Sequence, residues 1–476
     1  MGDDSIDRKT RSPLVCIIDR RNRDLFVFPE HEHNQYRFAG DSTVARSDLK
    51  SIGMDRPDLS PRFDAFPAAG RKLSDLIGHK LLFLCGFALF ALSAALCGLS
   101  RNYLSLLSGR ALLAVAGSMI LAVGPALLSA TFPPAQLGRV LGLQAIMTYI
   151  GLSLGPALGG WFTEWWGWPV IFFLTIPFSL LGLAAGIWAI PEIASNRRKP
   201  FDLKGFFFFI IGMTAYTLLL NLNVITGNRA SIGIMLLLLF ALSAWEFVRV
   251  EQKQPEPMLD LRLFRIRNIG FGALGAALNY LCFFLALFLL PFYFDHVLKY
   301  SAAAIGSLMT ITPLVMTVSA PISGALSDRT GPRLLTTLGM VFSTSALLLF
   351  GFMVKMPSSA ALHIVLILGL ILAGLGTGTF AAPNNSAILG AAPREKQGVA
   401  SGTLATFRYI GMMAGITLGG SLFELLQGCL ADSGFSTKSA FHGAILLVML
   451  AGALFGFMGI ICTLAMADKN PEKQET

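Results

Sequence analysis

Charged residues are scarce in this sequence. Asp, Glu, Lys and Arg make up 14% of the 476 residues, whereas 54% are hydrophobic and the mean hydropathy is +0.64. A soluble domain would carry about a quarter charged residues. The deficit excludes a large water-facing surface and indicates that lipid surrounds most of the chain.

Several chemical signatures are also missing. The six cysteines have no paired spacing, so we expect no disulfide framework, no metal site and no cofactor. The sequence has no Gly-x-x-x-x-Gly-Lys phosphate loop, and no cluster of His, Cys, Ser or carboxylate residues in a catalytic spacing, so we do not expect an enzyme. The net charge of +9 is spread over short turns, and positive-inside topology explains that distribution without a nucleic-acid partner.

What the sequence does contain is a series of long apolar runs. A helix needs about 20 such residues to cross a bilayer. The runs predict twelve membrane-spanning helices, at 81–99, 104–131, 140–161, 168–190, 205–222, 231–248, 269–292, 302–325, 334–354, 362–386, 402–425 and 441–466. We therefore predict an all-α polytopic membrane protein.

Basic residues are concentrated in alternate turns between these runs, which places the C-terminus in the cytoplasm. A Ser-Asp turn recurs before 81–99 and before 334–354, so the chain is expected to contain two pseudo-symmetric halves with two extra linking spans. The expected divisions are a poorly ordered polar tail at 1–67, an N-terminal bundle at 68–191, linking spans at 192–268, a C-terminal six-helix bundle at 269–468 and a tail at 469–476.

The two Ser-Asp turns are candidate gating loops. Glycine permits close helix approach, aspartate can cap the next helix, and arginine can bind carboxylates or helix C-terminal carbonyls across the two halves. The alternative is an ordinary positive-inside turn. The candidate residues are Asp75, Gly78, Gly324, Asp328, Arg329, Gly331 and Arg333.

A second motif lies in the run at 140–161. Gly151, Gly155, Gly159 and Gly160 surround Pro156, and small residues at this spacing allow tight helix packing in lipid. The proline bends the helix. The alternative is a generic packing face of the kind common in membrane helices.

Polar side chains inside apolar runs are candidates for a cavity. Arg110 and Arg408 lie within predicted spans, where a charge is costly and normally faces a cavity or a partner. Asn279, Asn384 and Asn385 could line a cavity or form hydrogen bonds between helices. No carboxylate lies near the middle of any span, so the sequence shows no titratable group of the kind that proton coupling normally uses.

From about residue 70 to 468 the chain resembles the 14-spanner drug:proton antiporters of the major facilitator superfamily. The turn Gly324–Arg333 is similar to the superfamily's Gly-x-Leu-Ala-Asp-Arg-x-Gly-x-Arg loop, and Gly151–Gly160 is similar to the antiporters' Gly-x-x-x-Gly-Pro-x-x-Gly-Gly helix. The connectors at 200–202, 256–264 and 398–402 also look like those of the group.

Three departures from the family pattern stand out. The first Ser-Asp turn has Arg71 where glycine is expected, and Leu113 and Ala114 replace Gln-Gly after Arg110. The family has two spans ahead of the first loop, where this chain has the polar tail at 1–67. The first of those spans usually supplies a membrane aspartate for proton handling. The resemblance therefore predicts that this chain lacks two spans and the carboxylate that would couple transport to protons.

The resemblance implies proton-coupled export of lipophilic or amphipathic small molecules by alternating access, from the inner membrane and with membrane lipid around the helices. A periplasmic adaptor and an outer-membrane channel are candidate partners. The alternative from another class is a truncated remnant without transport activity, or a regulatory membrane protein.

Overall fold

The computed structural model describes residues 78–131, 134–190, 203–220, 230–254, 259–356, 360–393 and 396–467. The predicted tail at 1–67, the C-terminal tail at 469–476, and Asp75 lie outside these residues. Within them the chain forms α-helices and one 3₁₀ helix. The helices are α4 (His79–Gly98), α5 (Tyr103–Thr131), α6 (Pro134–Trp166), α7 (Pro169–Ala189), α8 (Leu203–Leu219), α10 (Ala230–Lys253), η2 (Leu261–Arg265), α11 (Arg267–His296), α12 (Ala302–Thr330), α13 (Pro332–Met353), α14 (Ala360–Ala391), α15 (Gln397–Asp432) and α16 (Thr437–Leu464).

The prediction of an all-helical membrane protein is confirmed. Each of the predicted spans coincides with one α-helix of the described residues. Among these residues, 10 helices are long and apolar enough to cross a membrane, and α8 contains a shorter apolar stretch at Lys204–Leu219.

Most helices extend beyond the apolar runs that predicted them. α6 begins at Pro134 and not at 140, and α15 covers 36 residues where the apolar run covers 402–425. At the usual rise per residue, α15 is roughly 54 Å long, well beyond a hydrocarbon core of about 30 Å. Backbone hydrogen bonding continues past the last apolar side chain, so hydropathy marks only the embedded part of each helix.

Local sequence explains where several helices begin. Ser301 and Ser436 are extended residues whose hydroxyl oxygens accept hydrogen bonds from the N–H groups of Ala304 and Ser439, at 3.4 and 3.3 Å. Each cap satisfies an N–H group that the helix leaves unpaired. Pro332 opens α13, where its missing N–H is not needed.

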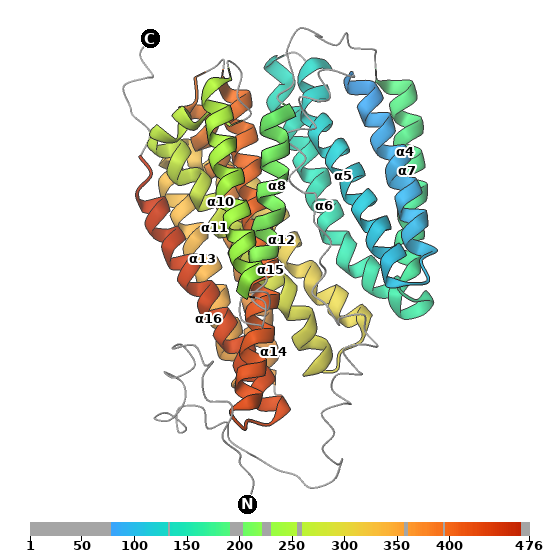
Figure 1. Cartoon of the computed structure of the whole chain (residues 1–476), viewed down its shortest axis with the longest axis vertical. Coiled ribbons are helices and arrows are strands. Elements are labelled where there is room, and N and C mark those ends of the chain that lie inside the picture. The colour runs from blue at the N-terminus through green and yellow to red at the C-terminus, as the bar shows by residue number, and fades with distance from the viewer. Residues whose placement is uncertain are drawn as a thin grey trace, which may run out of the picture.

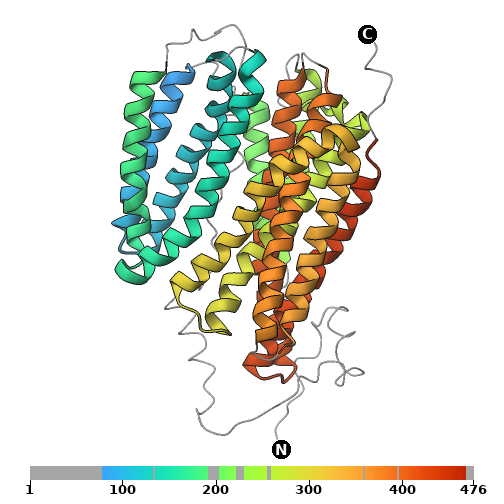
Figure 2. The same cartoon turned by 180° about the vertical axis from the view of Figure 1, so that it is seen from behind.

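The helices form two groups that lie side by side in Figures 1 and 2. We call α4 to α7 the N side and α11 to α16 the C side. α8 and α10 pair with each other, and Tyr216 and Leu220 pack against the main apolar cluster of the C side. The linking helices therefore lie against the C side. The division at 192–268 stays a prediction.

The C side has an extensive buried core. Leu285 of α11, Phe350 of α13, Leu366 of α14 and Val448 of α16 belong to one cluster and are almost completely inaccessible to solvent. The corresponding cluster that forms around Leu82 on the N side is much smaller. Among the side chains that the structure describes, the C side thus has the larger buried core.

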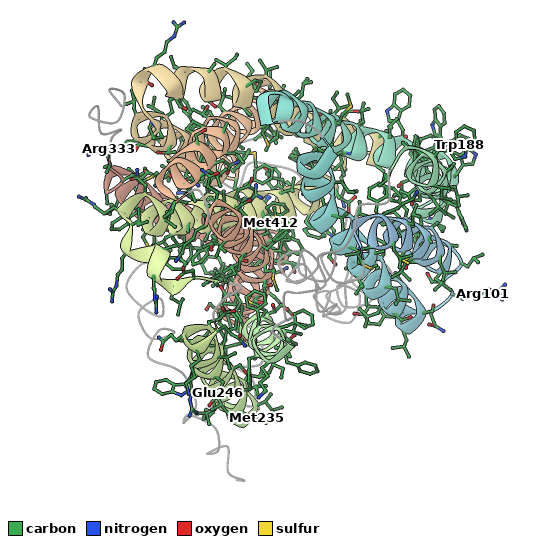
Figure 3. The ribbon with its side chains drawn as sticks, turned by 90° about the horizontal axis from the view of Figure 1, so that it is seen from above. Arg101, Trp188, Met235, Glu246, Arg333 and Met412 are labelled. Atoms are coloured by element: carbon green, nitrogen blue, oxygen red, sulfur yellow. The ribbon has the colours of Figure 1, made fainter. Side chains whose placement is uncertain are left out.

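Large apolar side chains cover the outside of both groups. Trp188 of α7 exposes 93% of its surface and Met235 of α10 exposes 59%. Both point outward from the rim of the molecule in Figure 3. Lipid tails are the environment that makes such a surface stable.

Glycines on α15 allow it to touch α11 through the backbone. A Cβ atom at Gly411 would overlap the carbonyl group of Ala277, and one at Gly415 would overlap that of Leu281. Association in lipid depends on such close contact, because lipid provides no hydrophobic force between helices.

We expect Gly411→Ala to destabilise the protein by about 1–3 kcal/mol, because the added methyl group forces α15 away from α11. Gly428→Ala is the matched control on the same helix, since nothing lies within 4 Å of a Cβ atom there. Thermal unfolding in detergent should show a lower Tm for the first variant and an equal or higher Tm for the second. Equal effects of the two changes would contradict the packing that we describe.

Candidate functional site

The N side and the C side meet where α6 crosses α12. A Cβ atom at Gly160 would lie 3.1 Å from Cα of Gly306 and would overlap the carbonyl oxygen of Ala302. A Cβ atom at Gly306 would in turn overlap the carbonyl oxygen of Pro156. The two backbones therefore touch directly, which only residues without side chains permit.

A carboxylate borders this crossing. Oε2 of Glu164 on α6 accepts a hydrogen bond of 2.8 Å from the N–H group of Ala303, in the first turn of α12. A helix N-terminus offers unpaired N–H groups and a partial positive charge, so it favours a carboxylate. We call this end of the molecule the Glu164 end, and the opposite end, where α12 finishes, the Gly331 end.

Only part of the predicted glycine motif takes part in the crossing. Pro156 and Gly160 contact α12, whereas nothing in the described chain lies within 4 Å of a Cβ atom at Gly151, Gly155 or Gly159. The tight packing expected for the whole motif is confined to its last turn.

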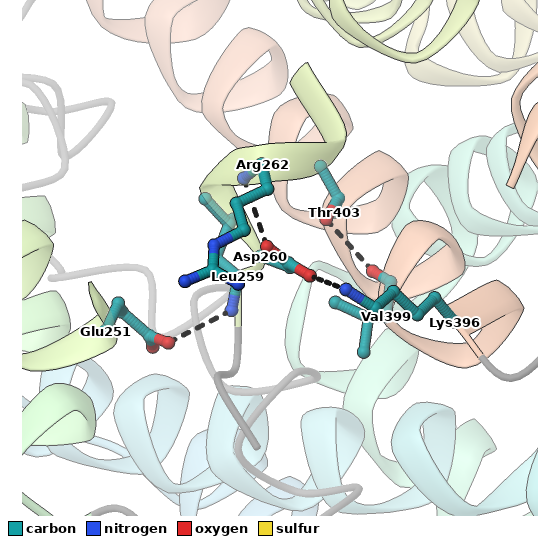
Figure 4. Close-up of polar contacts among 7 residues, drawn as sticks. All are labelled: Glu251, Leu259, Asp260, Arg262, Lys396, Val399 and Thr403. Carbon is teal, nitrogen blue, oxygen red and sulfur yellow. Dashed lines mark hydrogen bonds and ion pairs between the residues drawn. The ribbon is translucent and has the colours of Figure 1, made fainter. Parts of the chain in front are cut away.

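Polar contacts at the Gly331 end join α10, η2 and α15 (Figure 4). The carboxylate of Asp260 accepts hydrogen bonds from Lys396 Nζ at 2.6 Å and from the N–H group of Arg262 at 3.0 Å. The N–H group of Leu259 donates to Glu251 Oε2 at 3.4 Å. The connector at 256–264 is recognisable in the sequence by its family resemblance, but no local pattern indicates the ion pair, because the pair joins residues far apart in the chain.

The charge state of Asp260 depends on this pair. Burial of the side chain acts to raise its pKa, but the hydrogen bond from Lys396, the N–H group of Arg262 and the two nearby positive charges together hold the pKa below its usual value. Asp260 therefore remains ionised near neutral pH and fixes the start of α15 against η2.

The middle of the C side presents an aromatic surface. Tyr280 and Phe284 of α11 are nearly parallel, with ring centroids 6.5 Å apart, and Phe283 meets Phe284 edge-on at 5.2 Å. The guanidinium carbon of Arg408 on α15 lies 5.9 Å from the centroid of the Tyr280 ring, within range of a cation–π interaction. Sequence reasoning missed the aromatic residues, although their spacing of four was visible.

The two predicted membrane arginines lie in different groups of helices. Arg110 belongs to α5, and its guanidinium carbon lies 5.5 Å from the centroid of the Phe172 ring on α7, within the N side. Arg408 pairs with Tyr280 within the C side. The structure therefore does not bring Arg110 and Arg408 into one site.

Comparison with known proteins identifies the fold. Residues 65–416 and 272–475 match the Major Facilitator Superfamily. The chain belongs to this superfamily. The expected resemblance is confirmed at that level, and the protein is a multi-pass membrane transporter of small molecules and not an enzyme.

Individual members of the superfamily show a range of similarity. The riboflavin transporter RibZ of Clostridioides difficile (strain 630) is 34% identical over 353 residues, which cover 74% of this chain and 75% of that protein. The multidrug resistance protein Stp of Mycobacterium tuberculosis is 27% identical, covering 75% of this chain and 66% of Stp. The tetracenomycin C resistance and export protein of Streptomyces glaucescens is 28% identical, covering 76% of this chain and 65% of that protein.

A solved structure supports the superfamily fold. A crystal structure of a mutant of the peptide transporter POT aligns with 86% of this chain and 86% of its own chain, with a TM-score of 0.60 and 15% identity. At that identity the similarity concerns the fold alone.

The repeated turn of the superfamily has one backbone feature at both copies. Gly78 precedes α4 with φ of 103°, and Gly331 precedes α13 with φ of 83°. L-residues with a side chain rarely adopt these angles, so the glycines are required by geometry. Because successive helices alternate in direction, both glycines lie at the Gly331 end.

The other candidates of the second turn have different surroundings. A Cβ atom at Gly324 would make only ordinary contact with Ala382. Arg329 is exposed, and Arg333 lies at the rim of the C side in Figure 3. Asp328 is in the last turn of α12, and its side chain lies outside the described part of the structure.

The buried asparagines join helices of the C side. Nδ2 of Asn279 donates to Ser343 Oγ at 3.1 Å, and Nδ2 of Asn384 donates to the carbonyl group of Gly272 at 3.1 Å. Both are thus used for interhelical hydrogen bonds, the second of the two roles considered for them. Asn385 is partly exposed.

We expect Asp260→Asn to lower stability at pH 7 by about 1 kcal/mol, because it removes the charge pair but keeps an oxygen that can cap η2. Lys396→Met removes the other partner, and the double variant should be no less stable than either single variant. The pKa of Asp260 is lowered by folding, so its contribution is complete above the unfolded pKa of about 3.9 and is lost as pH falls through the folded pKa.

Thermal unfolding of the four proteins at several pH values checks this prediction. The Tm difference between the wild type and Asp260→Asn should shrink as the pH falls below about 4. Additive effects of the two single changes would contradict a direct pair.

Proposed function

We propose that this protein exports lipophilic or amphipathic compounds by alternating access, with proton antiport as the energy source. The observation that carries the proposal is the crossing of α6 and α12, whose backbones touch at Gly160 and Gly306 near the Glu164 end. A contact between two groups of helices at one end lets them rock about it, and so exposes a central site to each side in turn.

The proposed orientation follows from the basic turns. Arg329 and Arg333 lie at the Gly331 end, as do Arg262, Arg265 and Lys396. Positive-inside topology therefore favours the Gly331 end, with the C-terminus, on the cytoplasmic side of the cell membrane. In this orientation the α6–α12 crossing closes the outer face.

The relatives support the direction of transport. Two of them are named for multidrug resistance and for the export of tetracenomycin C. Membership of the drug:proton antiporter group and dependence on an adaptor are parts of the same proposal.

A second candidate is a membrane protein that binds substrate or partners without proton-coupled export. The observation that favours it is the position of the carboxylates. All carboxylates of the described spans lie toward the ends of their helices. They are Glu164, Glu246, Glu251, Asp295, Asp328, Glu424 and Asp432. Proton coupling commonly uses a buried carboxylate whose pKa is shifted.

Transport in energised membrane vesicles separates the two candidates. If the proposal is correct, vesicles that contain the protein accumulate or expel a lipophilic dye faster than control vesicles. A proton uncoupler should reduce that rate to the control level. Dye movement that matches the control vesicles would favour the second candidate, and movement that resists the uncoupler would exclude proton antiport.

We expect Gly160→Ala to reduce export at least tenfold, because its methyl group would overlap the carbonyl group of Ala302 and separate α6 from α12. Gly155→Ala is the matched control, since nothing in the described chain lies within 4 Å of a Cβ atom there. Initial dye-export rates, corrected for the amount of protein in the membrane, provide the measurement. Equal rates for the two variants would argue against a role for the crossing in transport.

A further inference from the structure

Basic and apolar residues alternate where the chain leaves η2 and enters α11. Leu263 and Ile269 are buried, whereas Arg262, Arg265 and Arg267 are exposed. The apolar side chains hold this segment against the helices, so the basic side chains remain on its outside. The segment lies at the Gly331 end of the molecule.

Packing against two helices fixes the shape of this segment. The ring of Phe264 lies against that of Phe407 on α15, with centroids 5.5 Å apart. A Cβ atom at Gly270 would lie 2.8 Å from the carbonyl oxygen of Phe264, so η2 folds back closely on the first turn of α11. The basic residues are therefore presented by an ordered turn, which lowers the conformational cost of binding a ligand.

The charge of this turn is positive. Asp260 is the one carboxylate among residues 259–270, and it already interacts with Lys396 and Arg262 (Figure 4). Arg265 and Arg267 are the other two charged residues of this range. Within the described chain, the guanidinium group of Arg265 has no hydrogen-bond or ion-pair partner.

Exposed apolar side chains continue from Arg267 along the same face of α11. Phe271 and Leu274 follow it by four and seven residues, which is the spacing of one helix face, and they expose 37% and 43% of their surfaces. Leu274 is about 10 Å from Arg267 along the helix axis. The surface is thus charged at the start of the helix and apolar one to two turns further into the membrane.

The end of α16 lies beside this part of α11. Nη2 of Arg267 donates a hydrogen bond of 2.9 Å to the carbonyl group of Ala465, and a guanidinium group has further N–H groups for a ligand. Ile461 and Leu464, in the last turn of α16, are exposed. They add apolar surface next to that of Phe271 and Leu274.

This order of groups matches the chemistry of a phospholipid. Its phosphate can bind guanidinium groups at the membrane surface while its acyl chains contact apolar side chains at greater depth. A soluble polyanion would leave the exposed Phe271 and Leu274 without a partner. In a zwitterionic lipid the positive headgroup offsets the attraction, so a net anionic lipid is favoured.

We propose that Arg265, Arg267, Phe271 and Leu274 form a binding site for an anionic phospholipid. The lipid phosphate contacts the two guanidinium groups, and an acyl chain lies along Phe271 and Leu274. The site requires neither a transport direction nor a transported substrate, so its test is independent of the proposed function.

The test compares two phospholipids with identical acyl chains. The delipidated full-length protein, in a non-ionic detergent, is titrated with phosphatidylglycerol or phosphatidylcholine, and native mass spectrometry counts the bound lipids. A basic side chain near an anionic headgroup contributes about fivefold to affinity, so we expect the first phosphatidylglycerol to bind at least tenfold more tightly. Equal affinities or a preference for phosphatidylcholine would overturn the proposal. Displacement of the lipid by an equal concentration of glycerol phosphate would indicate a site for free phosphate and would also overturn it.

Variants locate the site. The double variant Arg265→Gln, Arg267→Gln should weaken phosphatidylglycerol binding at least tenfold and leave phosphatidylcholine binding unchanged. Arg265→Gln alone should weaken it about fivefold without a change in Tm, because this variant keeps the hydrogen bond between Arg267 and Ala465.

The matched control removes the same charge from the opposite end of the molecule. Lys355 and Lys438 are exposed at the Glu164 end, and the double variant Lys355→Gln, Lys438→Gln should bind phosphatidylglycerol as the wild type does. Equal weakening by the two double variants would show that binding follows net charge and would overturn the assignment. Unchanged binding in the Arg265, Arg267 double variant would overturn it as well.

Discussion

The direct contact between the backbones of α6 and α12 is the constraint on which the arrangement of the two sides depends. In lipid, helices gain little from burying apolar surface, so close van der Waals contact and interhelical hydrogen bonds must hold them together. Gly160 and Gly306 meet at a point where neither can carry a side chain, and Pro156 lies one turn away. Among the helices of the described residues, α6 and α12 make the most extensive contact between the two sides.

The carboxylate of Glu164 lies at the edge of this contact. Its carboxylate occupies the N-terminus of α12 at the edge of the apolar region, where water competes for the same hydrogen bond. An exposed interaction of this kind is weak and is screened by salt. Its weakness is compatible with the proposed alternating access, in which this surface would separate. The small residues define where the helices touch, and the carboxylate favours one arrangement.

Sequence patterns were sufficient for the spans and their order, because a bilayer demands long apolar helices. They failed where the answer depends on which side of a helix faces a neighbour. Asn279 and Arg408 both interrupt apolar runs, but the first is buried against α13 and the second lies over Tyr280. Likewise, Asp260 and Lys396 are separated by most of the C side in sequence, so no local pattern indicates their ion pair. The glycines of the repeated turn were recognisable in the sequence as sites of close helix approach, whereas the positive φ angles that require glycine at Gly78 and Gly331 were seen only in the structure.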